Sequence, residues 1–335
     1  MAWRILRRSL SRCVAERQSV LEYALTTCFA GKEQLAKKEK KTMKKGFFTA
    51  LGTPLEKDGA FIPDSMAIQL EQQISVGVSG MLVMGSMGIE AYIKNREYPK
   101  VAELSAKIVH GRVPVLVGVT DVSIGRVKDR IDAIGDIQGI DGIVSTLPYY
   151  DALTQEEIYN FYTTIADYSK RPVYMYDLAV ITKAAILPET VQRLWKNPNI
   201  KGIKSGNIVT HRMLLQAETH PADFTQMFSN IDIFDIAYGY GIDHQLDGMF
   251  ACTPKTARRM YDALDAGNKE AAAKALNEIL ALRDLFASTV SLLDAFTYAM
   301  NLLGCRGEFK ADFENPVSEA AKEQVKQMMK RMGEI

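Results

Sequence analysis

The chain has 335 residues, 47% of them hydrophobic and 24% charged, and this profile excludes disordered, collagen-like and disulfide-scaffold proteins. Its net charge of +1 is uneven, because residues 1–46 carry 12 Lys and Arg against four Asp and Glu and leave the remainder at −7. A mildly acidic body offers no broad basic face, which argues against nucleic acid as a partner.

The first 42 residues form an N-terminal extension that we leave out of the fold. Five arginines lie among serines there, and no acidic residue precedes Glu16. This composition resembles an organellar transit peptide. We favour the alternative that translation begins at Met43, because the segment lacks a clear cleavage pattern. We then expect residues 1–42 to be disordered or non-native and the protein to be cytoplasmic, whereas a native extension would allow organellar import.

Eight short apolar runs follow, and each predicts a buried parallel strand. They span residues 47–55, 80–86, 113–120, 139–148, 171–178, 199–207, 223–230 and 246–253. The segments between them have apolar residues at helical spacing, and Thr154 and Pro188 are typical helix starts. Eight strand–helix units within about 210 residues favour a closed TIM (β/α)8 barrel over an open doubly wound sheet.

After Thr253 the pattern predicts helices only, over 257–267, 269–304 and 318–332. We therefore divide the body into a barrel over 43–265 and a C-terminal helical subdomain over 266–335. The part around residues 271–282 is rich in Ala and Leu, so its apolar stripe requires a partner on the barrel or on another subunit.

Several kinds of site are not expected. No run approaches about 18 consecutive apolar residues, so no membrane span is predicted. The four cysteines and four histidines are scattered without metal-ligand spacing. We therefore expect reduced thiols and no metal site.

A barrel of this type carries catalytic groups at the C-terminal ends of its strands, where the sixth predicted strand contains Lys204. Strand alternation places Lys201 and Ile203 on one face, and if that face is the outer one, Lys204 points into the barrel mouth. Apolar surroundings favour a neutral, nucleophilic amine, as Schiff-base chemistry requires. Because an arbitrary lysine more often reaches solvent or pairs with a carboxylate, the residues around Lys204 must decide whether it has a catalytic role.

Hydroxyl-bearing residues end the neighbouring strands, with the sequences YMYD at 174–177, PYY at 148–150 and GSMG at 85–88. With these motifs the body resembles the pyruvate-dependent class I aldolases, the family that contains dihydrodipicolinate synthase and N-acetylneuraminate lyase. The resemblance runs from about residue 46 to the C-terminal helices, and LPETVQRLWKNPNIKGIK at 187–204 is its most specific stretch.

The resemblance implies that Lys204 forms a covalent imine with pyruvate, without any cofactor. Tyr176 would relay protons beside that imine, and Ser86 would bind Tyr176 and help to hold the substrate carboxylate. Tyr150 would complete the relay, in many family members from a neighbouring subunit of a homotetramer or dimer. Covering an interface is an equally common role for such a tyrosine. Imine formation requires several proton transfers, which a phenol wired to hydroxyls can serve.

Three further residues are candidates for substrate binding. Gly85 and Gly88 let backbone N–H groups approach a carboxylate closely. Phe250, near the end of the eighth predicted strand, is expected to line the pocket, with core packing as the alternative.

The sequence departs from the family pattern at three positions. Met87 replaces a second threonine, which removes one donor to the keto acid and reshapes the pocket. Ile181 replaces the arginine with which dihydrodipicolinate synthases hold the aldehyde's carboxylate, although Lys183 is a partial substitute. Asp177 replaces an asparagine, and we have no account of that change.

The leading hypothesis is a lyase or aldolase that interconverts a larger 2-keto acid with pyruvate and an uncharged or sugar-like aldehyde, as N-acetylneuraminate lyase or a 2-keto-3-deoxy sugar acid aldolase does. The alternative within this class is a 4-hydroxy-tetrahydrodipicolinate synthase with an altered acceptor site. A non-catalytic 2-keto acid binding protein is the alternative from another class. Lys204, Tyr176 and Ser86 together disfavour it, since a binding protein requires no nucleophile.

Overall fold

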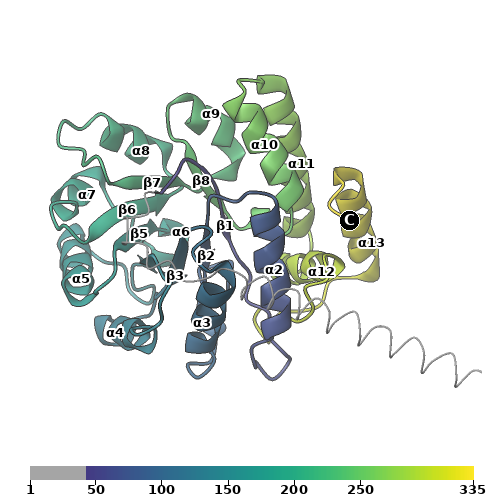
Figure 1. The fold of residues 1–335 in the computed structure, drawn as a ribbon, viewed down its shortest axis with the longest axis horizontal. Helices are drawn as coiled ribbons and strands as arrows, with labels where there is room; N and C mark the ends of the chain where they lie inside the picture. Colours follow the sequence, from purple (N-terminus) through teal and green to yellow (C-terminus); the bar gives the residue numbers. More distant parts are fainter. Residues whose placement is uncertain (1–42) are drawn as a thin grey trace, which may run out of the picture. The chain divides into compact units, whose positions relative to one another are not determined.

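The computed structural model describes residues 43–335, so the predicted extension over 1–42 lies outside the described residues. Eight parallel strands close into a barrel in which each strand pairs with the next and β8 pairs with β1 (Figure 1). The strands are β1 Gly46–Ala50, β2 Gly80–Val83, β3 Val115–Gly118, β4 Gly142–Thr146, β5 Val173–Asp177, β6 Ile200–Ser205, β7 Thr225–Phe228 and β8 His244–Asp247. The predicted TIM barrel is confirmed.

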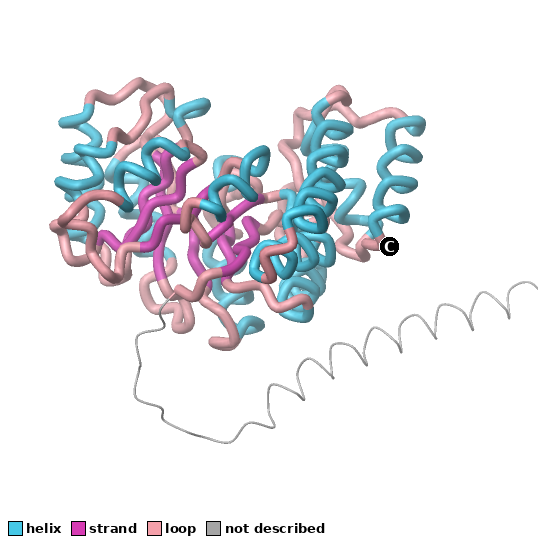
Figure 2. Tube along the Cα trace, turned by 90° about the horizontal axis from the view of Figure 1, so that it is seen from above, coloured by secondary structure: helices cyan, strands magenta, loops and turns pink. Residues whose placement is uncertain are grey.

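Helices follow the strands and surround the barrel, apart from one short helix after β5 that lies at its mouth (Figure 1 and Figure 2). They are α2 Pro63–Ser75, α3 Tyr98–Val109, α4 Ile124–Ala133, α5 Gln155–Tyr168, α6 Ala179–Thr182, α7 Pro188–Leu194, α8 Ile208–Leu215, α9 Phe234–Gly239 and α10 Pro254–Asp265. The predicted helix starts are present, because Thr154 and Glu157 form a capping box on α5 and Pro188 opens α7.

The helices α11 Lys269–Ala287, α12 Leu292–Leu302 and α13 Glu319–Met332 follow the barrel. The prediction of one continuous helical segment over 269–304 is wrong. After the β-branched pair Thr289 and Val290, the Ser291 side chain accepts the N–H of Asp294 and starts α12 as a new N-cap. The C-terminal part packs against the barrel, since Gln72 of α2 donates to the Leu303 carbonyl at 2.7 Å.

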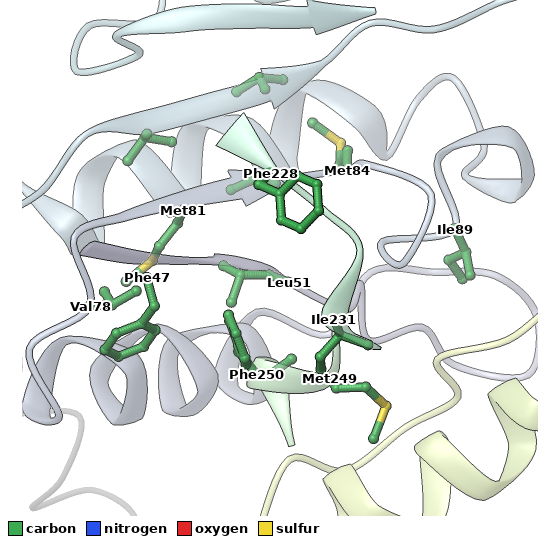
Figure 3. Close-up of a cluster of buried hydrophobic side chains, with 14 of the residues drawn as sticks. Phe47, Leu51, Val78, Met81, Met84, Ile89, Phe228, Ile231, Met249 and Phe250 are labelled. Carbon is green, nitrogen blue, oxygen red and sulfur yellow. The ribbon is translucent and has the colours of Figure 1, made fainter. Parts of the chain in front are cut away.

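Alternation along the strands separates two cores. The barrel interior holds Phe48, Ala50, Leu82, Leu116, Val144, Tyr174, Tyr176, Met227 and Leu246. The other faces of the strands contribute to a larger core beneath the helices, part of which Figure 3 shows. The face on which a residue lies therefore decides whether its side chain can reach the barrel mouth or only packs under the helices.

Residues 43–335 contain neither a membrane-spanning helix nor a metal-binding cluster. No helix in this range is long and apolar enough to cross a membrane. The same range holds no group of three or more His, Cys, Asp or Glu side chains that could bind a metal ion.

Candidate active site

Lys204 and Tyr176 lie side by side on the paired strands β6 and β5. The Lys204 Nζ lies 3.7 Å from the centroid of the Tyr176 ring, and both side chains are 5% exposed. The pairing of β5 with β6 shifts register at Lys201, whose Nζ bonds Asp223 at 2.6 Å. Ile203 packs in the outer core. Lys204 therefore faces the barrel interior with an amine held over an aromatic face.

Ser86 reaches the same point from the loop after β2. Its Oγ lies 3.2 Å from the Tyr176 phenol oxygen, so the two hydroxyls share a hydrogen bond. Thr53 holds the loop in place, because its Oγ1 donates to the Gly88 carbonyl at 2.7 Å. Met84 and Ile89, on either side of the loop, adopt left-handed φ angles of 54° and 50°. Such strain in non-glycine residues clusters at functional sites.

The two predicted glycines shape this loop. A Cβ on Gly88 would lie 2.9 Å from the Leu51 carbonyl oxygen, so the close backbone approach requires glycine there. A Cβ on Gly85 would meet the Leu82 side chain at 2.9 Å. The N–H groups of Ser86 and Met87 enter none of the hydrogen bonds within residues 43–335. Both N–H groups are free to bind an anion.

Met87 lies across the mouth between the β2 and β8 loops. It packs against both cores, and a Cβ on Gly248 would lie 2.6 Å from its Cε. The departure at Met87 is thus matched by the absence of a side chain at Gly248.

Asp177 joins the ends of β5 and β6 behind the lysine. Its Oδ1 accepts the N–H of Ile186 at 3.1 Å, and its Oδ2 accepts the Ser205 hydroxyl at 2.8 Å. The Ser205 Oγ in turn accepts the N–H of Asn207 at 3.0 Å. Burial raises the pKa of the Asp177 carboxyl, although these hydrogen bonds oppose the shift. The aspartate that the sequence left unexplained orients the backbone next to Lys204.

His211 supports the same strand end and was assigned no role from the sequence. One ring nitrogen, Nε2, lies 3.0 Å from the Ser205 carbonyl, and the other, Nδ1, lies 3.0 Å from Gln226 Oε1. Burial lowers its pKa, which favours the neutral ring. Strand alternation places Ser205 on the face opposite Lys204, and this pattern in the sequence could have indicated that Ser205 and its partners support the strand end.

Tyr150 and Ile181 lie at the rim. The Tyr150 side chain is 78% exposed, and within the described chain its hydroxyl bonds neither Tyr176 nor Ser86. Its backbone carbonyl accepts Lys183 Nζ at 3.0 Å, which connects the β4 loop to the end of α6. Ile181 is 49% exposed on α6. A single subunit therefore does not bring the Tyr150 phenol to the lysine.

The expectation that Phe250 lines the pocket is corrected by the structure. Strand β8 ends at Asp247, and Phe250 lies in the 3-10 helix Met249–Ala251. Its ring is fully buried in the outer core, at 5.7 Å and nearly perpendicular to Phe47 (Figure 3). The β8 residue in the interior cluster is Leu246, and Phe250 was misassigned because the predicted strand ran to residue 253, past the end of β8 at Asp247.

Comparisons with known proteins place the chain in a family. The model of the dihydrodipicolinate synthetase family matches residues 43–334. A 4-hydroxy-tetrahydrodipicolinate synthase from Acidiphilium cryptum is 27% identical over 296 residues, which cover 86% of this chain and 98% of that protein.

Solved structures show the same fold. YagE from Escherichia coli K12, in complex with pyruvate, superposes with a TM-score of 0.78 at 21% identity over 87% of this chain and 99% of that one. A catalytic lysine mutant of the Ruminococcus gnavus sialic acid aldolase gives a TM-score of 0.79 at 18% identity over 86% of this chain and 96% of that one. The chain belongs to the dihydrodipicolinate synthetase family and is a lyase of the class I aldolase type.

Proposed function

We propose that Lys204 forms an imine with the keto carbon of pyruvate or a related 2-keto acid, and that the resulting enamine is joined to, or released from, an aldehyde. The observation that carries this proposal is the buried Lys204 Nζ, 3.7 Å from the Tyr176 ring centroid inside the barrel. An unprotonated lysine amine is the nucleophile that imine formation requires. The reaction requires neither a metal nor an organic cofactor.

Tyr176 and Ser86 supply the proton transfers of this scheme. When the amine attacks the keto carbon, one proton moves from nitrogen to the new alkoxide oxygen, and the carbinolamine hydroxyl then takes up a second proton and leaves as water, which gives the iminium. Removal of a proton from the neighbouring carbon gives the enamine. The enamine attacks the aldehyde carbon while the aldehyde oxygen gains a proton, and water hydrolyses the resulting iminium to release the product and the free lysine. The Tyr176 phenol, bonded to Ser86 at 3.2 Å, is placed to exchange these protons.

The loop after β2 is proposed to hold the carboxylate of the keto acid. The free N–H groups of Ser86 and Met87, together with the Ser86 hydroxyl, provide three donors on one side of Lys204. The thioether of Met87 takes the place of a further donor, so the pocket next to the carboxylate is apolar on that side.

The proposed acceptor is an uncharged or sugar-like aldehyde. Ile181 offers no bidentate fork for a second carboxylate, and the Lys183 amine already bonds the Tyr150 carbonyl at 3.0 Å. A 4-hydroxy-tetrahydrodipicolinate synthase is the second candidate, supported by the name of the curated relative from Acidiphilium cryptum.

The proposed active form is a homotetramer or dimer in the cytoplasm. The Tyr150 phenol is 78% exposed, and we propose that it completes the proton relay of another subunit. A fully active monomer would contradict that role.

A product assay tests the acceptor. Pyruvate is incubated with neutral hydroxyaldehydes and, separately, with aspartate semialdehyde, and the condensation products are identified by mass spectrometry. We expect products from neutral aldehydes only, and a gain of aspartate semialdehyde turnover in Ile181→Arg, because a guanidinium restores bidentate recognition. Turnover of aspartate semialdehyde alone by the unaltered protein would favour the synthase. No product with any aldehyde would favour a non-catalytic binding protein.

A further inference from the structure

The two strands beside β6 differ at the positions where they leave the barrel. Lys204 pairs with Tyr176 of β5 and with Met227 of β7, and both of these residues belong to the interior cluster. Two residues further along, on the same face, β5 is followed by Leu178 and β7 by Ser229. Lys204 therefore has an apolar side chain on one flank of the mouth and a hydroxyl on the other.

The hydrogen bonds between β6 and β7 fix the place of Ser229. Its backbone N–H donates to the Ser205 carbonyl at 3.0 Å, which continues the parallel ladder one residue beyond the end of β7 at Phe228. Strand alternation therefore holds through Ser229, and its side chain lies on the face of Met227. Because Met227 is paired with Lys204, Ser229 lies about 6–7 Å further toward the mouth than the lysine backbone.

Strand β6 places no side chain between Lys204 and Ser229. Ser205 is on the opposite face, where it is bonded to Asp177. The residue after it is Gly206, at which a Cβ would lie 3.6 Å from the Ser229 carbonyl oxygen. The absence of a side chain at Gly206 leaves room beside the lysine on the β7 flank.

The Ser229 hydroxyl is half-buried and enters none of the hydrogen bonds within residues 43–335. Other hydroxyls at this end of the barrel are bonded to the protein. Thr146 Oγ1 donates to the Leu147 carbonyl at 2.9 Å, and Ser205 Oγ donates to Asp177 Oδ2 at 2.8 Å. A half-buried hydroxyl that no protein group satisfies is available to a ligand.

Asn230, the next residue, adds a second polar group with bonding capacity to spare. Its Oδ1 accepts the N–H of Asp232 at 3.3 Å and caps the 3-10 helix Ile231–Ile233. Its Nδ2 donates to no group of the described chain. The end of β7 thus offers a hydroxyl and an amide on consecutive residues.

On the β5 flank, the corresponding side chains are apolar or already bonded. Leu178 packs against the interior cluster, and Ile181 on α6 is apolar and 49% exposed. The Lys183 amine is bonded to the Tyr150 carbonyl at 3.0 Å. An alcohol group placed on this flank would give up its hydrogen bonds to water without replacement. The hydroxyls of a bound acceptor are therefore matched by the β7 flank.

We propose, on the basis of the imine chemistry above, that Ser229 is a specificity-determining residue that hydrogen-bonds a hydroxyl group of the acceptor aldehyde. The new C–C bond forms beside Lys204, so the other carbons of the acceptor extend from that point toward the mouth. A hydroxyl on these carbons comes within reach of Ser229, with Asn230 Nδ2 as a further donor. The serine hydroxyl both donates and accepts, as an alcohol partner requires. An aldehyde without hydroxyls leaves Ser229 unpaired, so the site favours hydroxylated aldehydes.

Kinetics with a matched pair of aldehydes test the proposal. Glyceraldehyde carries hydroxyl groups, and propanal has the same carbon chain without them. Each is offered with pyruvate, and the condensation product is quantified by mass spectrometry. We expect the wild-type protein to have the higher kcat/KM with glyceraldehyde. Ser229→Ala should lower kcat/KM for glyceraldehyde about three- to tenfold, as for one lost hydrogen bond, and leave the value for propanal unchanged.

Leu178→Ala is the matched control, because Leu178 occupies the equivalent position after β5. It should change kcat/KM for the two aldehydes by the same factor. Ser229→Thr keeps the hydroxyl and should keep the preference for glyceraldehyde. If Ser229→Ala does not fold, Ser229→Cys, which nearly preserves the size of the side chain, must show the same selective loss.

Borohydride trapping of the pyruvate imine precedes the kinetics and separates the failures. A wild-type protein that is not trapped contradicts the proposed function itself. Ser229→Ala should be trapped as fully as the wild type, because Ser229 is assigned to the acceptor alone. Where the wild type is trapped, the proposal is overturned by a wild type that does not prefer glyceraldehyde, by a loss of trapping in Ser229→Ala, or by a variant that loses activity equally with both aldehydes or with neither.

Discussion

The two sides of the barrel mouth differ in how fully their polar groups are bonded. On the β5–β6 side, the Asp177 carboxylate accepts the Ser205 hydroxyl, and the His211 ring is bonded to the Ser205 carbonyl. These bonds hold the backbone next to Lys204. On the β2–β8 side, the N–H groups of Ser86 and Met87 are free within the described residues, and Glu90 Oε2 has no partner there. The first side fixes the backbone around Lys204, whereas the second keeps polar groups without hydrogen-bond partners in the described chain.

The largest expected effect comes from Tyr176→Phe. The ring beneath Lys204 stays, but the hydroxyl bonded to Ser86 is lost, so kcat should fall by about 10²–10⁴. Tyr174→Phe is the matched control, because Tyr174 also faces the barrel interior but lies two residues nearer the start of β5. Steady-state kinetics check both variants, and equal losses in the two would show that the hydroxyl of Tyr176 has no special role.

Glu90→Gln should change how stability depends on pH. Burial raises the pKa of Glu90 in the folded protein to about 8, above its unfolded value, so the folded protein binds the extra proton and loses stability as pH rises through this window. The variant cannot ionise, and its stability relative to wild type should therefore rise by a few kcal/mol between about pH 5 and about pH 8. Urea unfolding at both pH values measures this. A constant difference would mean that Glu90 titrates normally.

A pair of serine variants separates the two sides of the mouth. Ser205→Ala leaves Asp177 Oδ2 and the Asn207 N–H without their partner, and should cost about 1–3 kcal/mol of unfolding free energy. Ser86→Ala removes a partly exposed hydroxyl and should cost less than about 1 kcal/mol while lowering kcat. Unfolding and kinetics are measured together. The comparison fails if Ser86→Ala is the more destabilising of the two.

The contact between Met87 and Gly248 joins the β2 and β8 loops on the second side of the mouth. Gly248→Ala places a Cβ about 2.6 Å from Met87 Cε and should cost about 1–2 kcal/mol, because the flexible thioether must move. Adding Met87→Ala removes the Cγ and Cε contacts but keeps the Met87 Cβ at 2.9 Å, so the double variant should recover part of that loss. A double-mutant cycle on unfolding free energies checks this, and additive effects would show that the two residues do not interact.

Most of the fold could be predicted because strand and helix periodicity is local. All eight strands were anticipated, and so was the division into a barrel and later helices. The break in the segment 269–304 was missed because the helical spacing of apolar residues continues across it. Ser291 is recognisable as an N-cap only once the backbone is seen to leave the helix before it. Phe250 was misassigned because an apolar run does not show where its strand ends: β8 stops at Asp247, and Phe250 lies beyond it in a 3-10 helix.

Candidate site residues could be predicted only where they belong to a recognisable sequence motif. Lys204, Tyr176 and Ser86 follow from strand ends and from the family resemblance, and the structure brings them together. Glu90 and Asp177 could not be assigned from the sequence, because their behaviour depends on burial and on partners distant in the chain.

Intact-mass spectrometry after incubation with pyruvate and borohydride detects the proposed imine at Lys204 itself. Lys204→Ala is run alongside, with its folding checked by circular dichroism. We expect a mass gain equal to one reduced pyruvate imine per chain in the wild type, mapped to Lys204, and no gain in the variant. A folded wild-type protein that shows no gain, or an equal gain in Lys204→Ala, would contradict it.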